Sequence, residues 1–196
     1  MGIKASFFRW WVNAWPHRVR LRKYVPEFLR SSPEPFRGEV LELGAGHGWT
    51  SRKILETFPQ VELTAVDSDS GAAKAFARLE AKYGRRLKAL QADLFKLPFD
   101  RESFDIVIGI NVFPYLKPYS VRKAVEESLR VLRPGGLLGI SDWALLQPSY
   151  NVRRKSLEEI LREEHCEILK ATGASPRALW ARKPYPIPPE SVTVEE

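Results

Sequence analysis

One short stretch constrains the fold of this chain more than any other. Residues 40–43 form an apolar run, interrupted only by Glu42, which predicts a short buried strand. Three glycines follow at alternate positions, namely Gly44, Gly46 and Gly48. The pattern then becomes helical over residues 49–58. Strand, glycine turn and helix in this order are typical of an open parallel sheet, which binds nucleotide-like ligands at such a turn.

The spacing of the glycines separates classes of ligand. A dinucleotide-binding turn has the pattern Gly-x-Gly-x-x-Gly, whereas here the third glycine comes one residue early and Trp49 stands in its place. Glu42 lies two positions before the first glycine, and the lysine of a phosphate-binding loop is missing. These features argue against NAD. A glycine turn that binds no ligand is the alternative that this stretch alone leaves open.

The positive charge of the chain is concentrated in its first 30 residues. They hold seven Lys/Arg and one acidic residue, a net charge of +6, whereas the other 166 of the 196 residues hold 24 Lys/Arg and 23 Asp/Glu, a net charge of +1. The nearly neutral body is too weakly basic for an RNA groove, so nucleic acid is not expected as a partner. Any anionic partner would meet the first 30 residues.

Nothing in the sequence predicts export or a membrane span. The single cysteine, Cys166, excludes an internal disulfide. No apolar run reaches the ~18 residues of a membrane span, and the aromatic N-terminus is followed by basic residues rather than by a small-residue cleavage site. We therefore expect a cytoplasmic protein.

The N-terminal aromatic residues allow two interpretations. Phe7, Trp11 and Trp15 lie four residues apart and form one face of a predicted helix. Such a face usually packs against a core, so it would cover either the core of the body or the ligand pocket. With the basic residues nearby, it also suits a helix on an anionic membrane, which would give peripheral membrane contact.

The body of the chain alternates predicted strands and helices. The strands are expected at residues 40–43, 61–66, 87–91, 104–110, 137–141, 166–171 and 178–181. The first five are separated by helical or loop segments, so the sheet should be mostly parallel with helices on both faces, an α/β fold. The last two strands are expected to pair with each other. The chain thus divides into an aromatic and basic helical extension (1–37), a body (38–183) and a proline-rich tail (184–196).

Polar residues follow the predicted strands where each one ends. In an open parallel sheet these carboxyl ends meet at one edge, so the glycine turn, Asp67, Asp93 and residues 109–111 are expected to converge. A carboxylate at position 67 can accept hydrogen bonds from both hydroxyls of a ribose, with a helix cap as the alternative. Asp93 can accept from an adenine amino group while the N–H of Leu94 donates to a ring nitrogen, or it is a simple turn residue.

Four segments together resemble the class I S-adenosylmethionine-dependent methyltransferases in order and spacing. They are residues 40–48, 65–68, 92–105 and 132–136. The resemblance covers residues 38–183. It implies a three-layer Rossmann-like sandwich with a seven-stranded sheet whose last strand is antiparallel. It also implies methyl transfer as the activity and S-adenosylmethionine as the cofactor.

The resemblance further implies which residues hold this cofactor. The full expected set is Glu42, Gly44, Ala45, Gly46, Asp67, Ser68, Asp93, Leu94, Ile110 and Asn111. The methionine part would lie against the glycine turn, Glu42 and the backbone of residues 110–111. The ribose would be held by Asp67, and the adenine by Asp93 and Leu94.

The acceptor of the methyl group is not identified by the sequence. Many family members carry a pair of histidines where this chain has Pro114-Tyr115, so no catalytic base is assigned. The three histidines share no metal-ligand spacing, and no metal is expected. We expect a small or amphipathic acceptor. Two alternatives are left open: a cofactor-binding partner subunit without turnover, and a membrane-associated methyltransferase of the lipid or quinone type.

Overall fold

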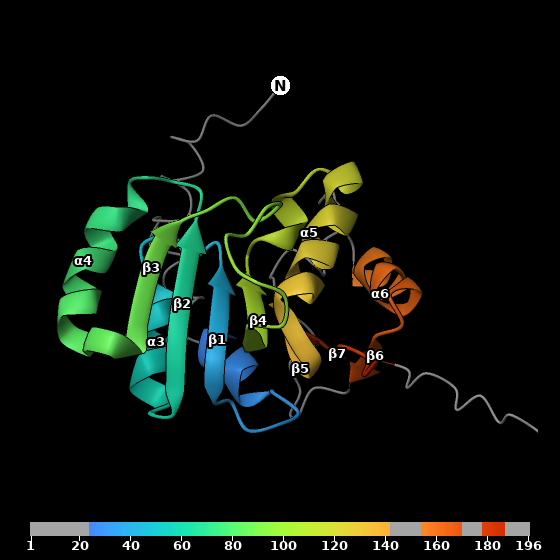
Figure 1. Ribbon diagram of the computed structural model, residues 1–196, viewed down its shortest axis with the longest axis horizontal. Coiled ribbons are helices and arrows are strands. Elements are labelled where there is room, and N and C mark those ends of the chain that lie inside the picture. Colours follow the sequence, from blue (N-terminus) through green and yellow to red (C-terminus); the bar gives the residue numbers. More distant parts are fainter. Residues whose placement is uncertain (1–23, 142–153, 170–177, 187–196) are drawn as a thin grey trace, which may run out of the picture.

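The computed structural model describes residues 24–141, 154–169 and 178–186 (Figure 1). The predicted aromatic face of residues 7–15 lies outside the described residues. The strands are β1 (Gly38–Leu43), β2 (Val61–Asp67), β3 (Leu87–Gln91), β4 (Phe104–Ile110), β5 (Leu132–Ser141), β6 (Glu167–Leu169) and β7 (Ala178–Arg182). The helices are residues 24–30, α3 (Trp49–Thr57), α4 (Ala72–Tyr83), α5 (Pro118–Val131) and α6 (Arg154–Glu163), with short 3-10 turns η1 (Gly84–Arg86) and η2 (Phe113–Tyr115).

The strands form one seven-stranded sheet in the order β3-β2-β1-β4-β5-β7-β6. The pairs from β3 to β5 are parallel, and β7 runs antiparallel to both of its neighbours, β5 and β6. These pairings confirm the predicted mostly parallel sheet, its antiparallel last strand and the pairing of the last two strands. The strand order reverses between β1 and β4, and open parallel sheets bind their ligands at such a reversal.

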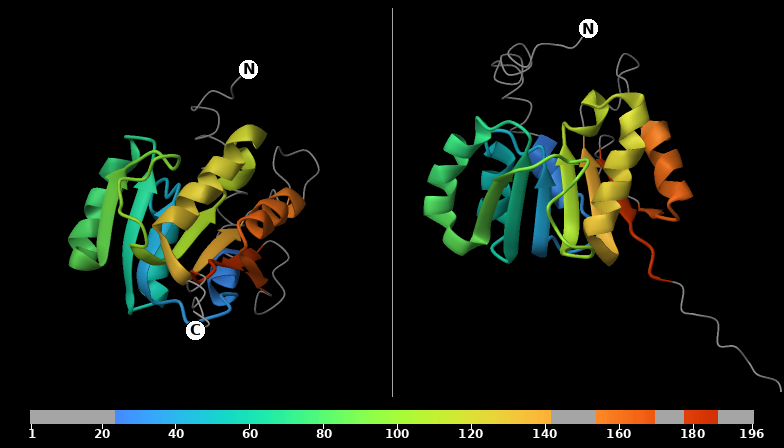
Figure 2. Two further views of the ribbon diagram at one scale, coloured as in Figure 1. Left: turned by 45° about the vertical axis from the view of Figure 1, so that its right-hand side comes forward. Right: turned by 45° about the horizontal axis from the view of Figure 1, so that its top comes forward.

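Helices cover both faces of the sheet and complete the three-layer sandwich. Figure 1 shows α5 and α6 in front of the sheet and α3 with helix 24–30 behind it, and Figure 2 gives the same arrangement from two further directions. The side chains of β4 alternate between the two cores: Ile106 and Ile108 pack on the side of α3, and Val107 on the side of α5. Because both faces are covered, β4 is almost entirely apolar. None of the helices in these described ranges has both the length and the apolar character that crossing a membrane requires.

Helix 24–30 is built into the core, although it lies in the segment predicted as an extension. Phe28 stacks on Trp180 of β7, with ring centroids 4.8 Å apart and ring planes within 5° of parallel. The indole Nε1–H of Trp180 donates to Ser31 Oγ at 3.1 Å. Both rings are fully buried. This helix therefore packs in the same core as the last strand of the sheet.

β5 begins earlier than the sequence predicts. Residues 133–136, Arg-Pro-Gly-Gly, predict a break before a strand at 137, yet the strand starts at Leu132. The N–H of Gly135 donates to the carbonyl of Lys183 at 3.0 Å, and the N–H of Lys183 donates to the carbonyl of Gly136 at 2.9 Å. Gly135 has a φ of +76°, which a glycine adopts without strain. Pairing with the segment after β7 thus keeps the Pro-Gly-Gly run within the strand.

Candidate functional site

The carboxyl ends of the parallel strands lie side by side at one edge of the sheet. Leu43 of β1 is paired with Val66 of β2 and with Gly109 of β4, while Asp67 is paired with Gln91 of β3. Three backbone hydrogen bonds continue the ladders past the strand ends, from Ala45 N–H to Val66 O (3.0 Å), from Ala92 N–H to Asp67 O (3.0 Å) and from Asn111 N–H to Ser141 O (2.9 Å). All ten residues predicted at the cofactor lie at or directly after the ends of β1 to β4.

The three glycines of the turn after β1 have different surroundings. A Cβ on Gly44 would lie 2.5 Å from a methyl group of Val112, and a Cβ on Gly48 would lie 2.6 Å from a methyl group of Leu79 on α4. A Cβ on Gly46 would meet no atom of the described residues within 4 Å. All three glycines have positive φ angles, between +54° and +74°. At Gly44 and Gly48, both the positive φ and the close packing therefore require a glycine. Gly46 instead faces open space in which a ligand can approach the backbone.

Asp67, the last residue of β2, holds the glycine turn in place. Its Oδ2 accepts a hydrogen bond from the N–H of Gly46 at 2.7 Å, and its Oδ1 accepts one from the N–H of Asp69 at 2.8 Å. Helix α4 starts only at Ala72 and has no side-chain cap, so Asp67 is not a helix cap. Each carboxylate oxygen keeps a further lone pair for a ligand hydroxyl.

Glu42 of β1 is buried, with 2% of its surface exposed. The hydroxyl of Ser51, in the first turn of α3, donates to Glu42 Oε2 at 2.6 Å. Burial raises the pKa of Glu42 to about 8, an effect that the Ser51 hydrogen bond reduces and the nearby Asp67 carboxylate increases. The carboxyl group of Glu42 is thus largely protonated at neutral pH in the free protein.

Asp93 and Ser68 lie at the exposed end of the site. The Oδ1 of Asp93 accepts from the N–H of Phe95 at 2.9 Å, which is the turn role that the sequence left open. Leu94 is partly buried against the core on the α5 side. The carbonyl of Ser68 accepts from the side-chain amide of Gln91 at 2.9 Å. Both residues therefore have local structural roles, and a ligand would meet them at the protein surface.

Asn111, directly after β4, makes a contact that sequence reasoning missed. It has a φ of +57°, which is rare for a residue other than glycine. Its Nδ2 donates to the hydroxyl of Tyr24, at the start of the described part of the chain. The two residues are 87 positions apart, and no local pattern links them. The other end of the amide, Oδ1, is buried and has no hydrogen-bond partner among the described residues.

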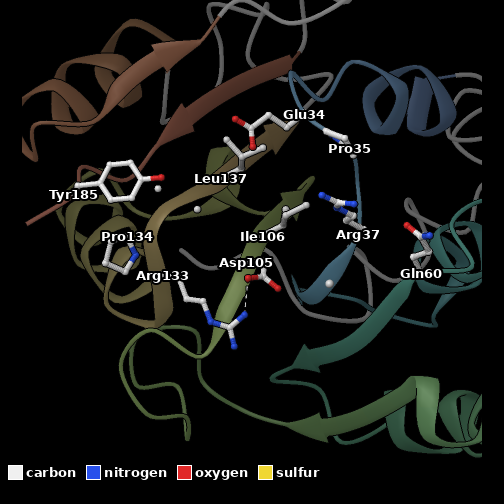
Figure 3. Close-up of a pocket in the computed structure, with 13 residues that line it drawn as sticks. Glu34, Pro35, Arg37, Gln60, Asp105, Ile106, Arg133, Pro134, Leu137 and Tyr185 are labelled. Atoms are coloured by element: carbon white, nitrogen blue, oxygen red, sulfur yellow. Dashed lines mark hydrogen bonds and ion pairs between the residues drawn. The ribbon is translucent and has the colours of Figure 1, made fainter.

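A separate cavity of about 440 Å³ lies at the opposite edge of the sheet (Figure 3). Its lining includes Gly38 and Asp105, near the starts of β1 and β4, and none of the ten predicted cofactor residues. The Arg133 guanidinium pairs with Asp105 at 2.5 Å, and the other oxygen of this carboxylate accepts from the N–H of Glu39 at 2.8 Å. The charged side chains of Arg133 and Asp105 thus pair with each other. We therefore do not include this cavity in the candidate ligand site at the carboxyl ends of the strands.

The strand order, the glycine turn and the edge beside it define a Rossmann-like fold of the class I methyltransferase type. Residues 40–136 match the methyltransferase-domain family, and this part of the chain is a methyltransferase domain. Over 149 residues, 69% of this chain, the sequence is 32% identical to a phthiotriol/phenolphthiotriol dimycocerosates methyltransferase of Mycobacterium leprae, of which it spans 51%. Over 110 residues, 55% of this chain, it is 32% identical to a sterol 24-C-methyltransferase of Gibberella zeae, of which it spans 28%.

Solved structures show the same architecture. The 1,6-didemethyltoxoflavin-N1-methyltransferase of Burkholderia thailandensis, determined with 1,6-didemethyltoxoflavin and S-adenosylhomocysteine bound, superposes with a TM-score of 0.74 at 20% identity, over 92% of this chain and 85% of that one. At this identity the likeness concerns the fold. The chain spans about half, or less, of the length of the two curated relatives described above.

Proposed function

We propose that this protein is an S-adenosylmethionine-dependent methyltransferase that acts on a small or amphipathic acceptor. The observation that carries the proposal is the open space at Gly46, within a glycine turn that Asp67 holds at the switch point of the sheet. A ligand can reach the backbone there and meet a carboxylate on one side. The cofactor, when bound, supplies a methyl group already activated by a sulfonium.

The residues at this edge fit the parts of such a cofactor. Asp67 offers acceptor lone pairs to ribose hydroxyls, and the exposed Asp93 offers them to an adenine amino group. The buried Glu42 offers an acceptor to the ammonium of the amino-acid end, and so does Oδ1 of Asn111, which has no hydrogen-bond partner within the described ranges. Gly44, Ala45, Ser68, Leu94 and Ile110 complete the proposed site.

The chain's own contribution to transfer would be mainly positioning. Displacement at an activated methyl group needs the acceptor atom in line, and holding two reactants in line supplies much of the rate. A base is required only for an acceptor that carries a proton at neutral pH. The sequence at Pro114-Tyr115 offers no histidine for that role.

Calorimetric titration tests the cofactor. We expect S-adenosylmethionine and S-adenosylhomocysteine to bind with micromolar-range affinity and NAD not to bind. Gly46→Val should abolish binding, because its side chain fills the open space beside the backbone. Gly84→Val is a matched control, since Gly84 has a similar φ of +56° and a Cβ there would also meet no atom within 4 Å in the described part of the chain, but it lies after α4 and outside the proposed site. Tight NAD binding without a signal for S-adenosylmethionine would contradict the proposal.

Turnover is tested separately from binding. The protein is incubated with methyl-labelled S-adenosylmethionine and a cell extract, with Gly46→Val as the inactive control. Label that enters an extract component only with the unaltered protein supports the enzyme. Cofactor binding without any transfer would instead favour a partner subunit that does not turn over.

Two features support a small or amphipathic methyl acceptor: the low net charge of the body and the aromatic residues near the N-terminus. The body carries a net charge of only +1, which is too little for an RNA groove. One curated relative is named for a sterol, which is an amphipathic molecule. On this proposal the aromatic face of Phe7, Trp11 and Trp15 covers the acceptor side, so deleting residues 1–16 should preserve cofactor binding and abolish transfer. A truncated protein that stays active but no longer sediments with anionic vesicles would point to a membrane helix.

A further inference from the structure

The hydroxyl of Tyr24 and the amide of Asn111 meet at the edge of the sheet that carries the proposed cofactor site. Tyr24 is 3% exposed and belongs to helix 24–30, while Asn111 is the first residue after β4. Asn111 donates through Nδ2, so the tyrosine oxygen is the acceptor. In this orientation the amide engages Tyr24 through Nδ2 and not through Oδ1.

The orientation of the amide leaves Oδ1 of Asn111 as a buried acceptor. It has no hydrogen-bond partner among the described residues. Leaving a buried acceptor unsatisfied costs about 1–3 kcal/mol, so such a group calls for an explanation. Asn111 also has a left-handed backbone, and conformations of this kind cluster where ligands bind.

The position of Asn111 indicates which ligand group would reach it. Its neighbour Val112 lies directly against the glycine turn, since a Cβ on Gly44 would be 2.5 Å from a methyl group of Val112. β1 lies between β2, which ends in Asp67, and β4, which precedes Asn111. A ligand whose ribose is held by Asp67 therefore brings its opposite end across the glycine turn to Asn111.

We propose that Tyr24 is a positioning residue, which holds the Asn111 amide so that Oδ1 accepts a hydrogen bond from the ammonium at the amino-acid end of the cofactor. The inference rests on the proposed cofactor and adds to it a residue that no sequence motif contains. Tyr24 itself need not touch the ligand, because it acts through the amide of Asn111. Helix 24–30 is then part of the cofactor site as well as of the core.

The test compares two ligands that differ only in the ammonium: S-adenosylhomocysteine and its deaminated analogue. Affinities are measured by calorimetry for the unaltered protein, Tyr24→Phe, Asn111→Ala and the double variant. We expect Tyr24→Phe to weaken S-adenosylhomocysteine by roughly five- to twentyfold and the analogue by less than about twofold. Because both residues act on one bond, the double variant should bind like Asn111→Ala alone.

Tyr83→Phe is the matched control, since the hydroxyl of Tyr83 is buried and has no hydrogen-bond partner among the described residues. It should leave both affinities unchanged. Equal affinities of Tyr24→Phe and the unaltered protein for S-adenosylhomocysteine would overturn the inference. So would an equal loss for both ligands, which would show a general packing role. Failure of the unaltered protein to bind S-adenosylhomocysteine would overturn the proposed function itself.

Discussion

The carboxylate of Asp67 accepts a hydrogen bond of 2.7 Å from the backbone N–H of Gly46, so the tip of β2 fixes the turn that follows β1. The same carboxylate accepts a second backbone N–H, from Asp69, at 2.8 Å. One side chain thus shapes the turn and still offers acceptor lone pairs at the proposed ribose position. Its two roles can be separated by experiment.

Asp67→Ala should reduce both cofactor affinity and stability. Loss of a hydrogen bond to a charged group costs about 1.5–3 kcal/mol, which corresponds to roughly ten- to hundredfold in affinity. The N–H groups of Gly46 and Asp69 also lose their acceptor, so the urea midpoint should fall. Asp69→Ala is the control, because its side chain accepts from Gly71 N–H, further along the chain, and not from the glycine turn. An unchanged affinity with a lower midpoint would leave Asp67 with the structural role alone.

Glu42→Gln should change how stability depends on pH. The pKa of Glu42 is raised to about 8 in the folded protein from an ordinary value of 4.5, so folding takes up a proton between these pH values. Stability therefore falls as the pH rises through this window, by about 1.4 kcal/mol for each unit of pKa shift. Glutamine keeps an acceptor for Ser51 and cannot ionise.

Denaturant unfolding at pH 5 and at pH 9 measures this effect. The glutamine variant and the unaltered protein should have similar midpoints at pH 5, and the variant should be clearly more stable at pH 9. Two pH profiles that run parallel would show that Glu42 ionises in the folded protein as it does in the unfolded chain.

Alanine substitutions at Gly46 and Gly48 should affect different properties, namely ligand affinity at position 46 and stability at position 48. Both substitutions place a side chain at positive φ, at a cost of about 1–2 kcal/mol. Only Gly48→Ala adds a close contact, with Leu79, so it should lower the free energy of unfolding more. Gly46→Ala should weaken S-adenosylhomocysteine more, as measured by calorimetry. The reverse ranking in either measurement would contradict the assignment of open ligand space to Gly46.

Phe28→Ala should destabilise the whole body. Truncating a fully buried phenylalanine costs about 3–5 kcal/mol, and here it also removes the ring that stacks on Trp180. Urea unfolding measures the loss. Tyr119→Ala, at a side chain that is 77% exposed, should change the free energy of unfolding by less than about 0.5 kcal/mol. A small effect of Phe28→Ala would mean that helix 24–30 contributes little to the core.

The sequence predicts most of the sheet because glycine, proline or polar residues mark the ends of its strands. The bounds of β3 and β4 agree with the predicted ranges 87–91 and 104–110, and β2 extends one residue further to Asp67. The predicted start of β5 was wrong because the Pro-Gly-Gly run is held in the strand by hydrogen bonds to Lys183, a partner far along the chain. Local patterns carry no information about such a partner.

The candidate site also combines features that the sequence predicts with features that depend on tertiary packing. The convergence of Asp67 with the glycine turn follows from strand order alone, since β1 and β2 are neighbours in a parallel sheet. The hydrogen bond of Glu42 with Ser51 could not be predicted, because Ser51 faces Glu42 only once α3 has packed on the sheet. The contact of Tyr24 with Asn111 could not be predicted, because it depends on where helix 24–30 docks.

Because Phe28 stacks on Trp180, helix 24–30 can complete its packing only late in the synthesis of the chain. Ser31, the hydrogen-bond partner of Trp180, lies 149 positions before it, so helix 24–30 leaves the ribosome long before its docking surface exists. β7 inserts between β5 and β6, so neither the sheet nor this face can close until the end of the body has been synthesised. A chain that stops before β7 would keep Phe28 and the edge of β5 exposed, and is expected to aggregate.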